Sequence, residues 1–407
     1  MSKRWSVALA SAMITVSVAA CGSPGQPGAA ADNGTAAAGG GGASGGAYKV
    51  GLVYSKSGPL ASYGQQYRQG LTAGIDYATK GTGAVAGHQI QITEQDDAGD
   101  PAKAVASATD LIGQGNKIIA GSTASGVALQ VAPLAKDNKV LFISGPAAAD
   151  AITGANRYTF RSGRQTYQDV ATAGTMLGDV KGKKVTVLAQ DSAFGKANVA
   201  AVTAVLGAKG ATVSSVEVPA AATDLTPFAT KVKDAAPDLL FVAWAGANAT
   251  AMWTTLGQQG VFDSTKVVTG LDIKATHALF GAVATKIDFL SHFFEGATAN
   301  PAYQALDAGL KKQGATVDLF TNDGFVAGQM IVHALEAGGD DVDKMVTSLE
   351  GWTFEGPKGS LQIRPEDHAL LQPMFTATLK KDGANVTPQL VKTLEPAAVA
   401  PPVKPFK

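Results

Sequence analysis

The residues best suited to chemistry in this chain lie in two small loops that carry almost no charge. Gly121–Gly126 follows the short apolar run Lys117–Ala120, and Ser144–Ala149 follows a second apolar run, Val140–Ser144. Small residues let a ligand approach backbone N–H groups closely, as the recognition of carboxylates and phosphates requires. Glycine, serine and alanine are also the residues of tight turns. The two loops alone therefore leave both ligand binding and simple turn formation open.

Enzymatic chemistry has little support in the sequence. There is no G-x-S-x-G motif, and the five histidines lack metal-ligand spacing. The segment Gly81–Gly87 looks like a dinucleotide-binding loop, but its third glycine is one residue late and it precedes a strand. Asp96, Asp97 and Asp100 could suggest a metal, yet Asp100-Pro101 is typical of a helix cap followed by proline in the first turn. We therefore expect no catalytic residue, no metal and no cofactor.

Alternating strands and helices must position the two loops. Val127, Val131 and Leu134 share one helical face between the two apolar runs, which predicts a βαβ unit with a right-handed crossover. The alternation extends from Tyr48 to about Asp272, which indicates an α/β fold with parallel sheets in two lobes. In open α/β sheets, ligands bind at the carboxyl ends of the strands, where both loops lie.

Charge and composition limit the possible partners. The chain has 33 basic and 33 acidic residues, so no excess of positive charge points to nucleic acid. It contains no Walker A sequence either, so an ATPase that works with this protein must be a separate chain.

The N-terminus is typical of an export signal. Lys3 and Arg4 precede the apolar segment Trp5–Val18, which is too short for an ordinary membrane span. The segment ends in VAAC, which resembles the lipobox of bacterial lipoproteins with Cys21 as the lipidated residue. We predict a signal peptide over residues 1–20 and an extracytoplasmic protein anchored to the membrane by lipid. Plain secretion with an accidental cysteine is the alternative.

A flexible tether is expected after Cys21. Residues 21–47 are rich in glycine, alanine, serine and proline and lack the apolar side chains that a core needs. By the scaling of Gly-rich coils, such a tether spans on the order of 25–30 Å.

Several segments, in their order and spacing, resemble a known family. They are GLVYSKSGPLASYGQQYRQGLTAGIDYA, EQDDAGDPAKAVASATDLI, YTFRSG, DSAFGKANVAAV and ATDLTPFATKVKDAAPDLLFVAWAG. The chain from Tyr48 to Lys381 resembles the type I periplasmic binding proteins, within them the leucine/isoleucine/valine-binding branch. The resemblance implies two doubly wound parallel-sheet lobes joined by three crossovers, which close on a small ligand. It places residues 48–163 and 296–375 in lobe 1, residues 164–295 and 376–396 in lobe 2, and a loose tail at 397–407.

The implied function is that of a substrate-binding lipoprotein for an ABC importer. The ligand would be a small amphipathic molecule, such as a branched-chain amino acid or a related amino acid or amide, handed to an ABC permease with separate ATPase subunits. Two alternatives stay open, namely a ligand sensor for a membrane receptor and a binder of an aromatic or other carboxylic acid.

The resemblance also implies the residues that contact the ligand. They are Tyr63, Ser125, Gly126, Ser144, Ala147, Ala148, Phe194, Trp244 and Asp272. Asp272 would pair with a ligand ammonium or else cap a helix, and Trp244 would stack on the ligand or pack in the core. The family's second acidic residue is replaced by Gln165 or Thr166, and Ala247 stands where the family has a tyrosine. These departures leave amides and aromatic acids possible beside branched-chain amino acids.

Overall fold

A computed structural model describes residues 46–406, apart from residues 247, 281–282 and 384. The predicted signal peptide, Cys21, nearly all of the predicted tether and Ala247 lie outside the described residues. No helix in the described part of the chain combines the length and the apolar character needed to cross a membrane.

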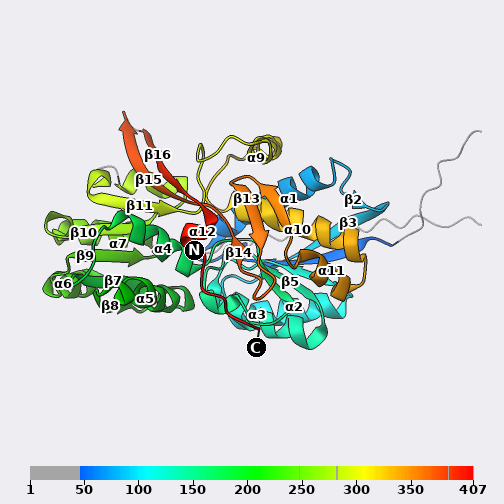
Figure 1. Cartoon of the computed structure of the whole chain (residues 1–407), viewed down its shortest axis with the longest axis horizontal. Coiled ribbons are helices and arrows are strands. Elements are labelled where there is room, and N and C mark those ends of the chain that lie inside the picture. The colour runs from blue at the N-terminus through cyan, green and yellow to red at the C-terminus, as the bar shows by residue number, and fades with distance from the viewer. Residues whose placement is uncertain (1–45, 247, 281–282, 384, 407) are drawn as a thin grey trace, which may run out of the picture. The chain divides into compact units, whose positions relative to one another are not determined.

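Lobe 1 is built on a six-stranded sheet with the strand order β2-β3-β1-β4-β5-β6, in which every pairing except β2–β3 is parallel. Figure 1 labels β2, β3 and β5 of this sheet. Its strands are β1 (Tyr48–Tyr54), β2 (Ala84–Val85), β3 (His88–Asp96), β4 (Ile118–Ala120), β5 (Leu141–Ser144) and β6 (Thr159–Arg161). Its helices are α1 (Ala61–Ala78), α2 (Pro101–Gly113), α3 (Ser125–Asn138), α9 (Pro301–Lys312), α10 (Thr321–Gly338) and α11 (Val342–Leu349). A small antiparallel sheet, β12 (Thr353–Gly356), β13 (Gly359–Ile363) and β14 (Leu370–Leu371), follows these helices.

Two hydrophobic cores cover the faces of the lobe 1 sheet. Leu52 and Tyr54 pack into one core with α1, α10 and α11, whereas Val53 packs into the other with α2 and α3. Because successive side chains of a strand point to opposite faces, this alternation makes the lobe a three-layer α/β/α structure.

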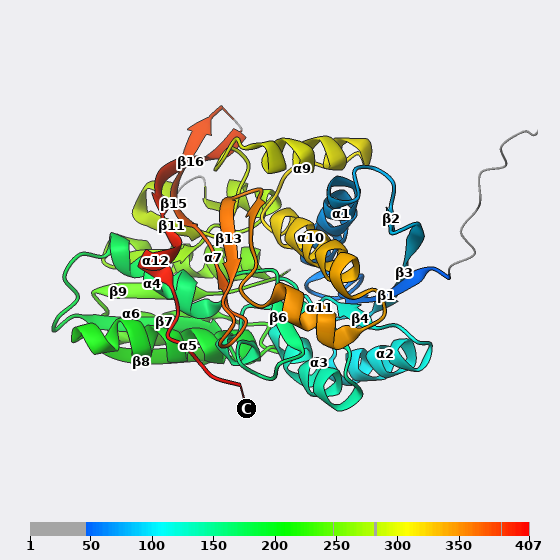
Figure 2. The same cartoon turned by 45° about the vertical axis from the view of Figure 1, so that its right-hand side comes forward.

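Close contact between α1 and α10 depends on glycine. A Cβ atom at Gly70 would lie 2.0 Å from the carbonyl oxygen of Thr321, and one at Gly324 would lie 2.0 Å from that of Tyr67. The two helices therefore run side by side at a separation that no larger residue allows at these positions (Figure 2).

Lobe 2 is built on a seven-stranded sheet with the strand order β16-β15-β11-β10-β9-β7-β8. Its strands are β7 (Lys184–Gln190), β8 (Thr212–Val218), β9 (Leu239–Ala243), β10 (Lys266–Gly270), β11 (Ile287–Ser291), β15 (Met374–Asp382) and β16 (Asn385–Leu394). Its helices are α4 (Thr166–Met176), α5 (Ala193–Val205), α6 (Thr226–Asp234), α7 (Ala249–Gln258), α8 (Lys274–His277) and α12 (Pro396–Val399). The pairings among β7–β11 are parallel, while β15 and β16 form an antiparallel edge.

The chain passes between the lobes three times, after β6, after β11 and between β14 and β15. The predicted α/β class with two mostly parallel sheets is confirmed. The antiparallel edges, β2 in one sheet and β15–β16 in the other, are the difference from an all-parallel sheet.

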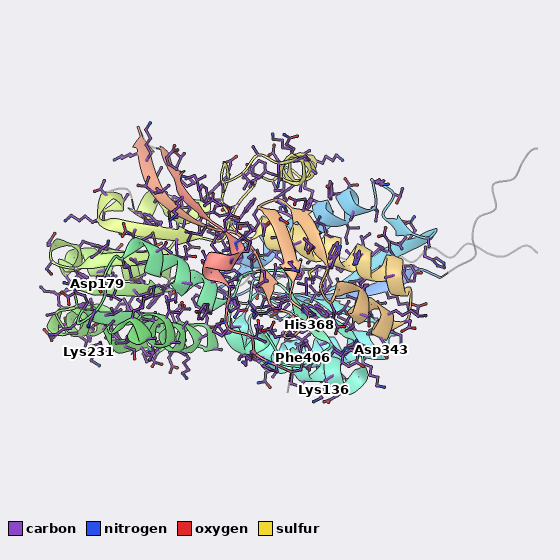
Figure 3. All side chains as sticks on the ribbon, in the orientation of Figure 1. Lys136, Asp179, Lys231, Asp343, His368 and Phe406 are labelled. Carbon is purple, nitrogen blue, oxygen red and sulfur yellow. The ribbon has the colours of Figure 1, made fainter. Side chains whose placement is uncertain are left out.

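The C-terminal tail, predicted to be a loose segment at 397–407, contacts lobe 1 in the structure. The Lys404 N–H donates a hydrogen bond of 2.9 Å to Oδ2 of Asp367. The ring of Phe406 meets His368 edge-on with centroids 4.6 Å apart. Figure 3 labels these two side chains. Hydrogen bonding to Asp367 and the ring contact with His368 therefore hold the C-terminal tail, although its composition alone does not predict an ordered structure.

Candidate ligand-binding site

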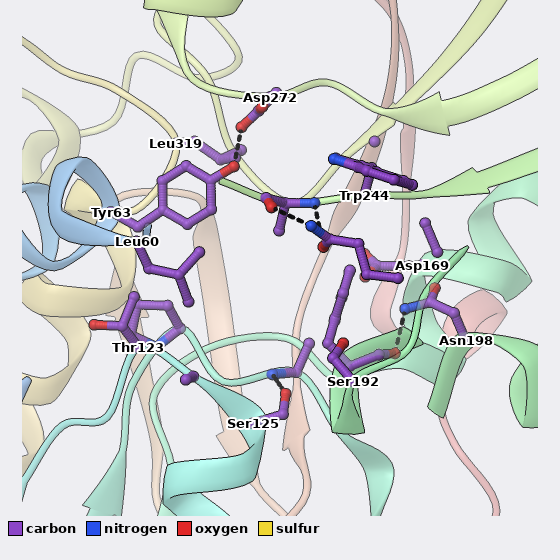
Figure 4. A pocket seen from close by; sticks show the side chains of 18 of the residues that line it. Leu60, Tyr63, Thr123, Ser125, Asp169, Ser192, Asn198, Trp244, Asp272 and Leu319 are labelled. Carbon is purple, nitrogen blue, oxygen red and sulfur yellow. Dashed lines mark hydrogen bonds between the residues drawn. The ribbon is translucent and has the colours of Figure 1, made fainter. Parts of the chain in front are cut away.

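A cavity of about 380 Å³ lies at the carboxyl ends of strands from both sheets (Figure 4). Its lining includes residues from the loops after β4, β5 and β6 of lobe 1 and after β7, β9, β10 and β11 of lobe 2. The carboxyl ends of parallel strands lie at one edge of a sheet, and ligands of open α/β sheets bind there. The loops after β4 and β5 are the two in which the sequence predicted a ligand.

Seven of the nine predicted ligand-contacting residues line this cavity, namely Tyr63, Ser125, Gly126, Ala148, Phe194, Trp244 and Asp272. Ser144 and Ala147 do not line it. Ser144 is fully buried at the end of β5, and the Ala147 N–H donates to the carbonyl oxygen of Ser122. Ser144 and Ala147 thus lie outside the cavity lining, and their contact with a ligand stays a prediction.

Backbone N–H donors for a carboxylate are available at the start of α3, but the N–H groups of the loop after β5 are already bonded within the protein. The N–H groups of Ala148 and Ala149 donate to Oγ of Ser125 at 3.2 and 3.1 Å, so they are already used within the protein. The first helical hydrogen bond of α3 runs from the Ala128 N–H to Ala124, and no side chain caps the helix. The N–H groups of Ser125 and Gly126 precede that bond, so they remain available at the positive end of the helix dipole.

Tyr63 connects the two lobes across the cavity. Its hydroxyl donates to Oδ1 of Asp272 at 2.7 Å and accepts from the Gly246 N–H at 3.1 Å. Tyr63 belongs to α1 of lobe 1, whereas Gly246 and Asp272 follow β9 and β10 of lobe 2. Figure 4 shows the bond between Tyr63 and Asp272 at one side of the pocket. These hydrogen bonds require the lobes to be close together.

Asp272 is a buried carboxylate without a cationic partner among the described residues. Burial raises the pKa of its carboxyl group, while hydrogen bonds from Tyr63 and the Ile273 N–H oppose that rise. The bond to the Ile273 N–H, 2.8 Å long, lies just before α8, but the N-cap of this helix is Ile273 and no side chain caps it, so the structure does not use Asp272 as a helix cap. A ligand ammonium would supply the missing positive charge.

Aromatic rings form part of the cavity wall. Phe194 lies in the first turn of α5, where Oγ of Ser192 caps the helix by accepting from the Gly195 N–H at 3.1 Å. Trp244 lines the cavity and also packs against the lobe 2 core, so the two alternatives for this residue are not exclusive. Its indole N–H donates to Oδ1 of Asn248 at 2.9 Å, which fixes the ring.

Arg164 is the charged residue of the site that sequence reasoning missed. It lines the cavity with a side chain that is 10% exposed, and its Nε donates to Oδ2 of Asp169 at 3.2 Å. Nη1 donates to the carbonyl oxygen of Pro146 at 2.8 Å, and the guanidinium carbon lies 5.8 Å from the centre of the Phe320 ring. The available signal was a basic residue in the loop after β6, at the same sheet edge as the predicted loops.

Gln165 does not stand in for an acidic ligand contact. It begins α4 as its N-cap in a reciprocal capping box with Gln168. Its side chain donates to Oδ1 of Asp150 at 2.7 Å and accepts from the Thr153 hydroxyl at 2.8 Å. Its amide is therefore fully engaged beside the cavity rather than in it.

The acidic cluster near β3 has the structural role that its spacing predicts. Oδ1 of Asp100 accepts from the N–H groups of Ala102 and Lys103 at 2.7 and 3.0 Å, which confirms the helix cap at the start of α2. Across the described residues, no group of three or more acidic, histidine or cysteine side chains is placed to hold a metal.

The chain belongs to the periplasmic binding protein family, since residues 47–384 match the family described as "Periplasmic binding protein". This confirms the resemblance seen in the sequence, and it makes the protein an extracytoplasmic solute-binding protein of the kind that serves ABC transporters, not an enzyme.

Its relatives cover most of the chain. The "Leu/Ile/Val-binding protein homolog 3" of Brucella melitensis biotype 1 is 27% identical over 82% of this chain and 91% of its own length. Among solved structures, an ABC-type branched-chain amino acid transporter from Rhodopseudomonas palustris CGA009 is 32% identical with a TM-score of 0.73, over 88% of this chain and 100% of its own. A solute-binding protein from Rhodopseudomonas palustris BisB5, in complex with 3,4-dihydroxy benzoic acid, is 25% identical with a TM-score of 0.75, over 86% and 97%.

Proposed function

We propose that this protein is the lipid-anchored receptor of an ABC importer and captures a small amphipathic carboxylate. The observation that carries the proposal is the cavity of about 380 Å³ with walls from both lobes. Ligand sites of this kind are concave and mostly apolar, with a few polar groups that orient the ligand. The apolar walls would take the body of the ligand, while the start of α3, Arg164 and Asp272 would take its polar groups.

A branched-chain amino acid or a related amino acid or amide is the first candidate ligand. Asp272 lacks a cationic partner and would accept hydrogen bonds from an ammonium, and the free N–H groups at the start of α3 would donate to a carboxylate. The relatives named for leucine, isoleucine and valine support this class.

An aromatic acid is the second candidate. The cavity wall includes the rings of Phe194, Trp244 and Phe320, and Tyr63 lies with its ring centroid 4.5 Å from that of Phe320. Offset and tilted ring pairs at such distances are favourable, so a planar ring would fit this lining. The relative that binds 3,4-dihydroxy benzoic acid supports this class.

Closure of the two lobes is the proposed mechanism of capture. A ligand that contacts both lobes binds the closed form better than the open form and shifts the population toward it. The bonds from Tyr63 to Asp272 and Gly246 exist only when the lobes are close. An ABC permease would then recognise the closed form, and its separate ATPase subunits would drive transport.

A thermal-shift screen tests the ligand class. L-leucine, L-valine, L-leucinamide, benzoate and 3,4-dihydroxybenzoate would be added to the full chain without its signal peptide. A ligand present at 100 times its Kd adds about 2.7 kcal/mol to stability, which raises the melting temperature measurably. If none of these compounds raises it at millimolar concentration, capture of a small amphipathic carboxylate is refuted.

Cys21 is the proposed lipidation site. Cells that express the full chain would be fed a clickable palmitate analogue, and the wild-type protein would be compared with Cys21→Ser. Label on the wild type and none on the variant is the expected result. An unlabelled wild type that appears in the medium would support plain secretion instead.

A further inference from the structure

We propose that Arg164 reads the charge of the ligand, and that the ligand class is therefore a small carboxylate with an apolar body whose anionic group hydrogen-bonds to Nη2 of Arg164. The inference rests on the proposed solute-binding function and deepens it. It differs from the carboxylate site proposed above for amino acids, which is the start of α3.

The guanidinium of Arg164 is held in place but not used up. Nε is bonded to Asp169 and Nη1 to the carbonyl oxygen of Pro146. Nη2 has no hydrogen-bond partner among the described residues, although the whole residue is only 8% exposed. Because a guanidinium is planar and always charged, two fixed nitrogens also fix the direction of the third. Nη2 is thus a charged donor without a hydrogen-bond partner, on a rigidly held guanidinium that lines the cavity.

Arg164 is the only permanent cation in the cavity lining of the described residues. The other ionisable groups there are Tyr63, Asp169, Asp272 and His292, and burial together with the charge of Arg164 lowers the pKa of His292 well below its ordinary value. His292 is therefore neutral at pH 7. A ligand anion finds one lasting positive charge in the site, and charge-assisted bonds to a guanidinium are about twice as strong as neutral ones.

An apolar cluster lies on one side of the Arg164 guanidinium. The Phe320 ring lies 5.8 Å from the Arg164 guanidinium carbon and 4.5 Å from the Tyr63 ring, centre to centre. Leu319 lies in the same cluster as Tyr63 and Phe320. A carboxylate on Arg164 would thus leave the rest of the ligand along a continuous apolar wall. That arrangement suits an aromatic or branched aliphatic acid better than a doubly charged or sugar-like solute.

Two matched ligand pairs test the assignment by isothermal titration calorimetry. The pairs are benzoate with benzamide and 4-methylpentanoate with 4-methylpentanamide, so that each pair differs only in the charged group. Wild-type protein should bind the acid more tightly than the amide, by about 10- to 100-fold, because hydrogen bonds to charged groups contribute more than neutral ones. In Arg164→Gln this preference should fall to within about threefold, because the acid loses its cationic partner, whereas the amide loses only a weaker hydrogen bond.

Control variants separate charge recognition from folding. Arg157→Gln removes an arginine whose ion pair with Glu350 is on the exposed surface of lobe 1, and it should keep the full preference. If Arg164→Gln does not fold because Asp169 is left unpaired, the double variant Arg164→Gln/Asp169→Asn removes both charges and takes its place. Arg164→Lys keeps the charge but not the planar fork, and it should keep only part of the preference.

The outcomes distinguish this inference from the proposed function. If wild-type protein binds one of the acids and the preference persists in the Arg164 variants, the carboxylate lies elsewhere, and the start of α3 is its site. If wild-type protein binds neither acid at millimolar concentration, this assignment fails, whereas a thermal shift with L-leucine or L-valine would still support the proposed capture of a small amphipathic carboxylate.

Discussion

Removing the hydroxyl of Tyr63 should open the protein without unfolding it. In Tyr63→Phe, the ring and its contact with Phe320 remain, but two hydrogen bonds between the lobes are lost. Oδ1 of Asp272 loses a donor at 2.7 Å, and the Gly246 N–H loses an acceptor at 3.1 Å. The loss of these two hydrogen bonds destabilises only the closed form, because water can bond to Asp272 and to the Gly246 N–H when the lobes separate.

The size of the effect follows from those two bonds. A hydrogen bond to a charged group contributes about 1.5–3 kcal/mol, and a buried unpaired N–H costs about 1–3 kcal/mol. A loss of about 3 kcal/mol lowers the closed-to-open ratio by roughly 100-fold, since 1.4 kcal/mol corresponds to a factor of ten. When the closed form becomes the minor species, the apparent Kd rises in proportion to its lost population. We expect binding to weaken by roughly 30- to 100-fold.

Calorimetry with benzoate and small-angle X-ray scattering of the unliganded protein would measure the effect. The radius of gyration should increase, the apparent Kd should rise, and the thermal unfolding of the unliganded protein should change little. Tyr158→Phe is the matched control, because the Tyr158 hydroxyl also donates to a carboxylate, Oδ1 of Asp343 at 2.9 Å, but within lobe 1. If Tyr63→Phe binds benzoate as tightly as the control does, these bonds do not hold the closed form.

Three further substitutions test the fold and the cavity. Burial raises the pKa of the Asp318 carboxyl from 3.8 to about 6, so the folded state keeps a proton that the unfolded chain has lost. That stabilisation is complete below about pH 3.8 and is lost as the pH rises through 6. The free energy of unfolding in urea should therefore include this pH-dependent contribution in the wild type, and Asp318→Asn should lack it. Gly70→Ala should cost about 3 kcal/mol of unfolding free energy, because its Cβ would meet the Thr321 carbonyl oxygen at 2.0 Å, whereas Gly113→Ala meets no atom within 4 Å and should be neutral or slightly stabilising. Phe194→Ala removes a ring from the cavity wall and should weaken benzoate binding by about tenfold in calorimetry, with an unchanged affinity refuting the contact.

The order of the elements was predictable because it is a local property of the sequence. Apolar runs and helical periodicity identified β4, α3 and β5, and Asp100 marked the start of α2. The strand β16 was missed. Pro388 lies within it, and proline argues against a central strand. Pro388 is tolerated because β16 is at the edge of its sheet. The edge position results from the pairing of β16 with β15, which the sequence of β16 alone does not determine.

The outline of the site was predictable for a similar reason, but the direction of its side chains was not. Parallel strands bring their exits to one edge, so seven of the nine predicted residues line the cavity. Ser144 follows the same pattern but faces inward. Arg164 was missed because its direction depends on Asp169 and the Pro146 carbonyl oxygen, and only the folded chain brings these groups together.

Recognition and closure share the same parts of the molecule. Arg164 follows β6 and His292 follows β11, so two of the three segments that connect the lobes also line the cavity. A ligand on Arg164 would sit where the chain must bend, while Tyr63 and Asp272 join the lobes at another part of the lining. Only contacts that differ between the open and closed forms can shift their populations. A carboxylate bound to Arg164, beside the segments that connect the lobes, and an apolar body bound between the lobes would together make contacts that differ between the open and closed forms. Neither group would do so alone.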